Sequence, residues 1–296
     1  MNRATALQML LLSALWGVSF LLIRLAGAAF PPAWVALLRC LCGAAVLLVA
    51  LRMGRHALPP LTLWKPLLLV AVFNNVLPWT FFAWGEQTVS SNIAAILNAT
   101  TPLFSVLIGL GLPGGRLGGR ALLGVLVGLG GVTLTVSGGV AGGHASLRGA
   151  LLIAAASLGY AIATVIAKRH LQGLNPTALA TSQLTLASLL LLPLAAFGPH
   201  PAGVTGSALG AVVALGVFGS GLAYLVYYGL LARVSATQVT AVTYALPVWG
   251  LFWAAVAGER PTALAALGVA VVLAGLLLLN APVRRTPASA PGQPTD

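Results

Sequence analysis

Aromatic and amide side chains recur at matched places in two stretches of the chain and mark a candidate ligand site. Four residues of the first stretch share one helical face because they recur at i, i+3, i+4 and i+7: Asn75, Pro78, Trp79 and Phe82. The positions 145 residues later hold Ser220, Ala223, Tyr224 and Tyr227. Rings placed in this way could stack on the apolar side chain of a small ligand, or attract a flat or quaternary cation.

Trp16 and Tyr160 form a third matched aromatic pair, 144 residues apart. Each lies near the middle of an apolar stretch, so we expect both to line the same site as Trp79 and Tyr224. The alternative is that Trp and Tyr mark the belts at the membrane–water interface. Four aromatic residues near the ends of apolar stretches fit that alternative: Trp34, Trp64, Trp84 and Tyr228.

Three prolines fall inside apolar stretches: Pro78, Pro102 and Pro247. Each removes a backbone donor and disturbs the carbonyl four residues earlier. Pro102 and Pro247 occupy matched positions, and interrupted helices at matched positions are typical of transport sites. Asn98 and Thr243, four residues before them, could then bind the amino or carboxylate group of a ligand. The alternative is a packed kink in which Thr bonds its own backbone.

Arg39 lies about seven residues into an apolar stretch, where a charge is costly enough to suggest a function. It could hold a substrate carboxylate in the mouth of a cavity. Alternatively, it snorkels to the outer surface or bonds to helix carbonyls. Gln183 stands at the matched position, so the two sides of the site would differ in charge. Arg24 is closer to the end of a stretch and is interpreted as a snorkelling anchor.

Acidic and metal-binding residues are scarce where chemistry would need them. The chain has three acidic residues, Glu86, Glu259 and Asp296, and none falls in the middle of an apolar stretch. All four histidines fall in loops, and Cys40 and Cys42 are interpreted as small packing residues. The acids, bases or metal ligands of an enzyme are therefore missing, and we expect no cofactor and no metal. The lack of a buried carboxylate also predicts facilitated transport.

The composition is that of a membrane protein. The 296 residues are 59% hydrophobic and 6% charged, with a mean hydropathy of +1.01, whereas soluble domains carry about 25% charged residues. A helix needs about 20 apolar residues to cross a bilayer. Ten stretches qualify and predict an all-α integral membrane protein with ten transmembrane helices: 6–26, 34–51, 66–84, 92–112, 121–140, 147–167, 177–197, 207–231, 236–257 and 262–281.

The net charge of +12 is explained by sorting the basic residues onto the two sides of these spans. Eleven fall on one side: Arg3, Arg52, Arg55, Lys65, Arg116, Arg120, Lys168, Arg169, Arg233, Arg284 and Arg285. Only Arg148 and Arg260 fall on the other side. By the positive-inside rule, both termini lie in the cytoplasm. Anionic lipid is the natural partner of these charges, and nucleic acid is not needed to explain them.

The matched spacing extends over nearly the whole chain and indicates a duplication. The predicted repeats are residues 1–142 and 143–281, followed by a disordered cytoplasmic tail, 282–296, that is rich in Pro, Ser and Thr. Five spans is an odd number, so the second copy enters the membrane in the opposite sense. A 5+5 inverted repeat is typical of secondary transporters with alternating access. The sequence leaves the oligomeric state open, and a monomer is compatible with it.

Two segments with the same Ser-to-Pro spacing, Ser90 to Pro102 and Ser235 to Pro247, carry a resemblance to a known family. The second is followed by GERPT at 258–262 and a glycine-spaced final helix. Over about residues 5–281, the chain resembles the paired EamA domains of the drug/metabolite transporter superfamily. The resemblance implies ten helices, an inverted repeat and export of small metabolites. The chain is most similar to bacterial inner-membrane exporters of aromatic and other amino acids, which also handle the dication paraquat.

The resemblance leaves two functions open: export of amino acids and related metabolites, or a multidrug or quaternary-cation exporter of the same fold. Glu259 and Arg260 match the family's Glu-Arg pair, and we assign them, with Pro102 and Pro247, to hinge or structural roles. The first half departs from this pattern, because Gly115 stands where the second half has Glu259. A role that needs the pair on both sides is therefore not supported by this sequence.

Overall fold

The computed structural model of the chain describes residues 3–111, 118–231, 233, 242–259 and 262–280. This part is helical, apart from turns and one isolated bridge between Val89 and Ala145. The first half contains α1 (Arg3–Gly27), α2 (Pro32–Met53), η1 (Leu61–Leu63), α3 (Trp64–Ala71), η2 (Val72–Val76), α4 (Leu77–Gly85), α5 (Ser91–Asn98), α6 (Thr101–Leu110) and α7 (Gly119–Ala141). The second half contains α8 (Leu147–His170), α9 (Pro176–Ala196), α10 (Gly206–Gly216), η3 (Val217–Leu222), α11 (Ala223–Leu231), α13 (Val242–Val256) and α14 (Ala263–Asn280).

These helices confirm the predicted all-α fold with two sets of five spans. Eight helical stretches of the described chain are long and apolar enough to cross a bilayer, and two shorter apolar helices follow, Val242–Val256 and Ala263–Leu279. The third span combines α3, η2 and α4, the fourth combines α5 and α6, and the eighth combines α10, η3 and α11. The predicted ninth span, 236–257, begins among residues that lie outside the described part.

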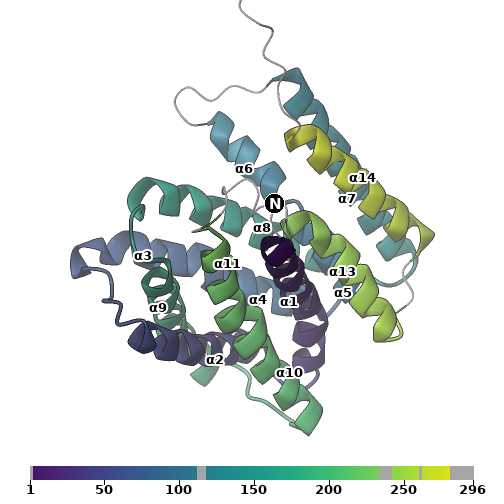
Figure 1. Cartoon of the computed structure of the whole chain (residues 1–296). Helices are drawn as coiled ribbons and strands as arrows, with labels where there is room; N and C mark the ends of the chain where they lie inside the picture. The colour runs from purple at the N-terminus through teal and green to yellow at the C-terminus, as the bar shows by residue number, and fades with distance from the viewer. Residues whose placement is uncertain (1–2, 112–117, 232, 234–241, 260–261, 281–296) are drawn as a thin grey trace, which may run out of the picture.

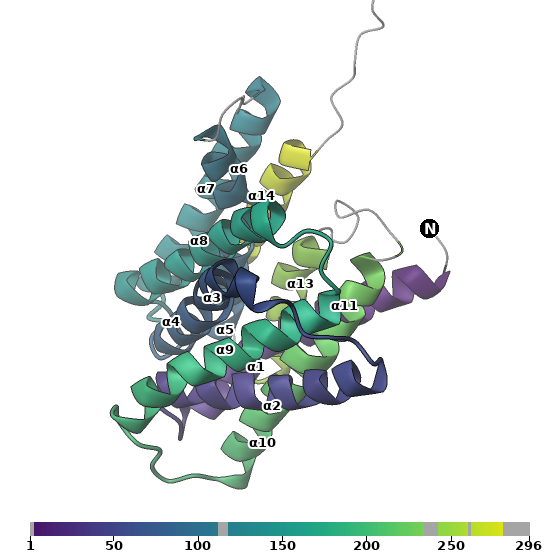
Figure 2. The same cartoon turned by 90° about the vertical axis from the view of Figure 1, so that its left-hand side faces the viewer.

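Helices of one half pack mainly against helices of the other half. α2 lies beside α9, and α7 lies beside α14, in both views (Figure 1, Figure 2). α1 packs against α10 and α13, which belong to the eighth and ninth spans. α8, the counterpart of α1, packs against α4, α5 and α6 of the third and fourth spans. Each half therefore uses its first helix in the same way against the other half.

Two short π-helical segments widen the third and eighth spans at matched positions. η2 begins at Val72, and η3 begins 145 residues later at Val217. In η2 the cause is local: Pro78 has no N–H for the carbonyl of Asn74 and its ring would collide with that carbonyl, so the turn widens. η3 contains no proline. Its Gly221 permits close packing against α2, because a Cβ at this position would lie 2.6 Å from the Cβ of Val46.

Pro102 breaks the fourth span as the sequence predicts. α5 ends at Asn98, and α6 begins at Thr101 with Pro102 in its first turn, a position that a proline tolerates. The Thr101 hydroxyl donates to the freed carbonyl of Asn98 at 2.8 Å. The break is thus the packed kink described above, in which a Thr side chain satisfies the backbone.

Pro247 lies inside the continuous helix α13, so the prediction of a second interrupted span at this position is wrong. The neighbouring residues of α13 are packed tightly against two helices of the first half. A Cβ at Gly250 would lie 2.3 Å from the Cβ of Ala95 in α5, and the Trp249 side chain occupies the space that a Cβ on Gly17 of α1 would need. These contacts keep α13 a continuous helix although Pro247 lacks a backbone N–H. They come from distant segments, so the local sequence does not reveal them.

α7 and α14 approach each other so closely that glycine is required between them. A Cβ at Gly275 would lie 2.5 Å from the backbone nitrogen of Gly128 and 2.7 Å from the carbonyl oxygen of Gly124. Gly124 and Gly128 therefore serve helix packing.

Candidate functional site

Arg39 projects from α2 into the bundle and is only 7% exposed. Its Nε donates a hydrogen bond to the Ser220 hydroxyl of η3 at 2.9 Å. Its guanidinium carbon lies 3.9 Å from the centroid of the Trp79 ring of α4, which is a cation–π contact. This burial is incompatible with snorkelling to the surface. The ion pair found within the described residues joins other side chains, so Arg39 has no ion-pair partner there, although Glu86 is near enough for the two charges to interact.

Side-chain amides form a second polar contact between the same two halves. Asn74 donates to Oε1 of Gln183 at 3.2 Å and to the Tyr224 hydroxyl at 3.0 Å. Asn75, which is fully buried, donates to the same hydroxyl at 3.2 Å. Its other polar atom, Oδ1, is buried and has no hydrogen-bond partner.

The two polar contacts use matched positions. Arg39 of the second span meets Ser220 of the eighth, and Gln183 of the seventh span meets Asn74 of the third. Gln183 is the counterpart of Arg39, and Asn74 is adjacent to Asn75, the counterpart of Ser220. Nearly the same pair of positions is therefore joined twice, once with a charge and once without.

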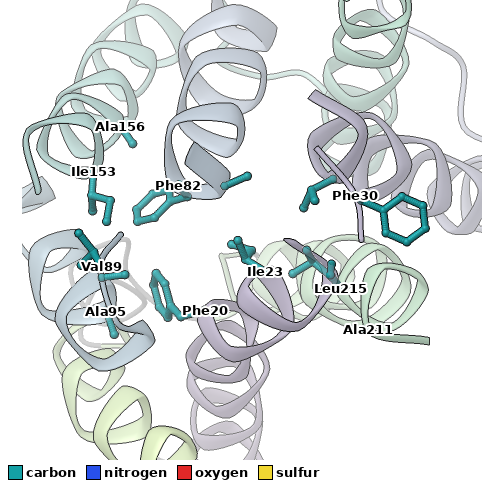
Figure 3. Close-up of a cluster of buried hydrophobic side chains, with 14 of the residues drawn as sticks. Phe20, Ile23, Phe30, Phe82, Val89, Ala95, Ile153, Ala156, Ala211 and Leu215 are labelled. Carbon is teal, nitrogen blue, oxygen red and sulfur yellow. The ribbon is translucent and has the colours of Figure 1, made fainter. Parts of the chain in front are cut away.

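Aromatic rings surround this polar cluster and continue toward one end of the bundle. Phe82 stacks on Tyr160 with 6.2 Å between ring centroids, and it meets Phe20 edge-on at 5.6 Å. Figure 3 shows Phe20 and Phe82 pointing toward each other between α1, α4 and α8, with Val89 beside them. Trp16 lies against Tyr227 at 5.5 Å. Phe20, Phe82 and Val89 belong to one buried apolar cluster, and Tyr160 packs against it.

The structure brings together most of the residues that the sequence proposed. Arg39, Trp79, Asn75 and Tyr224 are in direct contact or share a partner. Pro78 and Phe82 are buried on the same helix, as the predicted face requires. Asn98 and Thr243 lie elsewhere, at the end of α5 and at the start of α13. Whether any of these residues binds a ligand stays a prediction.

Two polar residues that the sequence did not assign to the site join the cluster: Asn74 and Tyr228. Gln183 and Ser220 also join it, as their matched positions indicated. Tyr228 was interpreted as part of the interfacial belt, but its ring packs against Tyr224 at 5.9 Å and Tyr227 at 5.1 Å. Trp64 and Trp84 are exposed, as that belt predicts.

A hollow of about 760 Å³ lies away from this cluster, at the end of the bundle where the sequence places the outer surface. Its walls come from the end of α1, the turn between α4 and α5, the turn between α7 and α8, and the turn between α13 and α14. Arg24 and Glu259 form an ion pair at 2.5 Å in this hollow, and Glu259 also accepts a hydrogen bond from Ser91 at 2.8 Å. Arg24 is therefore an ion-pair partner, and its role as a snorkelling anchor stays a prediction.

Glu86 also lines the hollow, and its burial differs from what the sequence predicted. It directly follows α4, at the end of a span as predicted, but its side chain is only 6% exposed. The expectation that the chain has no buried carboxylate is therefore wrong, because the end of α1 and two other turns gather around this helix end. Arg260, the predicted partner of Glu259 in the Glu-Arg pair, lies outside the described residues.

Within the described part of the chain, no three His, Cys, Asp or Glu side chains come close enough to hold a metal ion.

The EamA-like transporter family matches the sequence twice, over residues 3–137 and over residues 147–281. The chain belongs to this family. It is 29% identical over 276 residues to the uncharacterized inner membrane transporter YedA of Escherichia coli (strain K12), which covers 90% of this chain and 87% of that relative. It is 34% identical over 217 residues to the probable terminal-alkyne amino-acid exporter of Streptantibioticus cattleyicolor, which covers 71% of each.

A solved crystal structure with 23% sequence identity has the same fold, with a TM-score of 0.69 over 95% of this chain and 97% of its own. With the two matched repeats and the apolar helices, these likenesses establish a multi-pass membrane transporter of small molecules rather than an enzyme. The family thus agrees with the resemblance found in the sequence.

Proposed function

We propose that this EamA-family protein exports aromatic and other neutral amino acids, and related small metabolites, across a bacterial inner membrane by alternating access. Both termini then lie in the cytoplasm, and transport follows the gradient of the substrate. Support for the substrate class comes from the relative in Streptantibioticus cattleyicolor, whose name describes an amino-acid exporter. The chemistry of the polar cluster supports it independently.

Arg39 is the observation that carries this proposal. A buried guanidinium without an acidic partner is costly, and a ligand carboxylate would neutralise it through charge-assisted hydrogen bonds. Ser220 and Trp79 already orient the guanidinium. Such a pre-oriented charge suits a ligand that carries a carboxylate.

The surroundings of Arg39 suit the rest of an amino acid. Oδ1 of Asn75 is a buried acceptor without a partner, and it could receive a hydrogen bond from an ammonium group. Tyr160 and Phe82 provide stacked rings for an apolar side chain. Trp16 and Tyr227 extend the aromatic wall from the other half.

Alternating access is supported by the way in which the first helix of each half packs against the third and fourth spans of the other half. An inverted pair of repeats, divided near residue 142 and followed by the tail at 282–296, would produce the swapped packing of α1 and α8. Opening toward the outside would separate the Phe20–Phe82 contact and the Arg24–Glu259 pair. The break at Pro102 provides a hinge next to α5, and Pro247 and Arg260 are proposed to support the matching movement of the second half.

Facilitated transport is supported by the composition of the spans. Within the described spans, no Asp or Glu side chain makes a hydrogen bond or an ion pair with Arg39. The buried carboxyl group whose charge interacts with that of Arg39 belongs to Glu86, which follows the end of α4 and lines the outer hollow. We propose that it exchanges protons with the outer side only. We further propose that the cytoplasmic basic residues contact anionic lipid and that one copy of the chain is sufficient for transport.

Export of drugs or quaternary cations is the second candidate. The contacts among Tyr224, Tyr227 and Tyr228 favour it, because clustered rings bind cations. Arg39 opposes it, because its charge would repel a cation at short range.

Counterflow in proteoliposomes separates these candidates. Vesicles loaded with unlabelled amino acid should take up labelled phenylalanine, and 3-phenylpropionate should compete more strongly than a quaternary aromatic cation. Trp79→Ala and Tyr224→Ala should both slow phenylalanine uptake, whereas the exposed Trp64→Ala should leave it unchanged. Counterflow of the cation without counterflow of any amino acid would contradict the proposal, and so would normal uptake by both variants.

A further inference from the structure

The outer hollow contains more acid than its own basic groups satisfy. Glu259 has two partners there, Arg24 and Ser91. Glu86 has none: both of its carboxylate oxygens are buried without a hydrogen-bond partner. The Arg24–Glu259 pair therefore leaves Glu86 as the one acid of the described hollow without an ion-pair partner.

Glu86 is held in this position by the backbone around it. Its N–H donates to the carbonyl of Phe82 at the end of α4. The next residues of the turn are tied to the turn between α7 and α8, because Ser90 N–H donates to the His144 carbonyl and Ser146 N–H donates to the Thr88 carbonyl. The backbone at Glu86 is thus held at the wall of the hollow, and its turn is tied to the turn that joins the two halves of the bundle.

A buried carboxyl group without donors is expensive, and the chain retains it in a space large enough for a small molecule. A cation that entered the hollow would supply the missing donors and charge. The primary ammonium group of an amino acid has both, and the hollow lies beyond the Phe20–Phe82 contact on the outer side of the central cluster.

We propose that this hollow is an exit subsite in which the Glu86 carboxylate binds a primary ammonium group. The assignment as an exit rests on the function proposed above, whereas binding of an amine to the hollow does not. In the central site the carboxylate of a substrate meets Arg39, and in the outer hollow its amine meets Glu86. A zwitterion would therefore be held by opposite ends at the two places.

Protons compete with the amine for Glu86. Burial, and then the nearby charge of Glu259, raise the pKa of the Glu86 carboxyl group well above its ordinary value, and the charges of Arg24 and Arg39 oppose this shift. Amine binding requires the ionised form, so affinity for an amine should rise with pH. A proton that binds in this hollow from the outer side returns to the same side, and facilitated transport is therefore preserved.

The other elements around the hollow contribute few further charges. The turn between α7 and α8 contributes His144, and the described part of the turn between α13 and α14 contributes Glu259. α5 contains no titratable residue. The charge at the start of α8, Arg148, lies on an apolar groove with Phe81 and Leu151 instead. A variant must therefore separate the contribution of His144 from that of Glu86.

Calorimetric titration of the purified full-length protein tests the subsite without transport. Phenethylamine presents an amine without a carboxylate, and 3-phenylpropionate presents the reverse. Glu86→Gln keeps the size of the side chain and should weaken phenethylamine binding about tenfold or more. Asp296→Asn removes one carboxylate at the last residue and should leave both affinities unchanged. Binding of 3-phenylpropionate to Glu86→Gln at the wild-type affinity shows that the variant is folded.

The pH profile of the wild-type protein gives a second readout. Phenethylamine should bind more tightly as pH rises from about 5 to about 8, and the profile should flatten in Glu86→Gln but remain in His144→Gln. Equal phenethylamine affinity in wild type and Glu86→Gln would overturn the subsite, as would a flat wild-type profile or no binding at all. If instead phenethylamine binds through Glu86 but no amino acid undergoes counterflow, the exit role and the proposed function fail while the amine site stands.

Discussion

The polar cluster around Arg39 and the outer hollow around Glu86 each contain one buried charged side chain, but the two differ in the sign of the charge and in the partners that the side chain has. Arg39 is basic and has a hydroxyl acceptor and a ring in contact with it. Glu86 is acidic, is buried to the same degree, and has no hydrogen-bond partner. Neutral partners keep the Arg39 guanidinium oriented, so it can bind a counter-ion. A buried carboxylate without partners, such as that of Glu86, is easily neutralised by a proton. The two sites are therefore expected to differ in ligand sign and in their response to pH.

The largest expected effect tests the basic side of this contrast. Arg39→Gln should lower counterflow of phenylalanine by about a hundredfold, because a buried charge-assisted contact with the carboxylate is lost. Arg39→Lys should restore part of the rate, since it keeps the charge but loses the planar fork. Arg148→Gln, on the exposed start of α8, is the matched control. A wild-type rate of counterflow in Arg39→Gln would show that the substrate carboxylate binds elsewhere. The two sites would then no longer be expected to differ in ligand sign.

Ser220→Ala tests how firmly Arg39 is held. Removing the hydroxyl leaves the buried Nε without an acceptor, and the apparent unfolding free energy in detergent should fall by about 2 kcal/mol. Thermal unfolding measures this, and the exposed Ser207→Ala should change stability by less than about 0.5 kcal/mol. An equally small effect for Ser220→Ala would show that Arg39 has other sufficient partners.

Glu86→Gln should change the pH dependence of stability in a defined direction. Because the pKa of Glu86 is raised in the folded protein, ionisation opposes folding, and wild-type stability should fall as pH rises above the unfolded pKa of about 4.3. The Gln variant lacks this cost and should be more stable by about 1 kcal/mol near pH 8, with no difference near pH 4. Thermal unfolding across this range checks the sign; an advantage that shrinks as pH rises would contradict it.

The smallest expected effect concerns the Arg24–Glu259 pair. The Arg24 side chain is 48% exposed, so solvent weakens the attraction, and Glu259→Gln should cost less than about 1 kcal/mol. The loss should shrink further in high salt because exposed charges are screened. Unfolding at low and high salt measures it. A loss that is independent of salt would show that this pair is as protected as Arg39.

The sequence predicted the spans and the face of the third span well, because both depend on local patterns. A run of apolar residues must cross the bilayer as a helix wherever it packs. Asn75, Trp79 and Phe82 are buried together because spacing along a helix sets their shared face. Pro78 and Pro102 disturbed their helices for the same local reason, the loss of a backbone donor.

The errors concern residues whose surroundings come from distant segments. Pro247 was expected to interrupt α13, and Glu86 was expected to lie at a helix end of a chain without a buried carboxylate. α1 and α5 pack against α13 beside Pro247, and the end of α1 and two turns from other parts of the chain line the hollow at Glu86. Tyr228 was assigned to the interfacial belt because its place near a span end is visible in the sequence, while its contact with Tyr224 is not.

The order of residues alone determined that this chain lies in a membrane, that it contains two similar halves, and which side chains share a helix face. Hydropathy and helical spacing act over a few residues and do not need a partner. Only the tertiary structure decided that Arg39 meets Ser220 across 181 residues and that Glu86 is buried unpaired. Burial and hydrogen bonding depend on atoms that folding brings from elsewhere, and the charge chemistry of both sites depends on them.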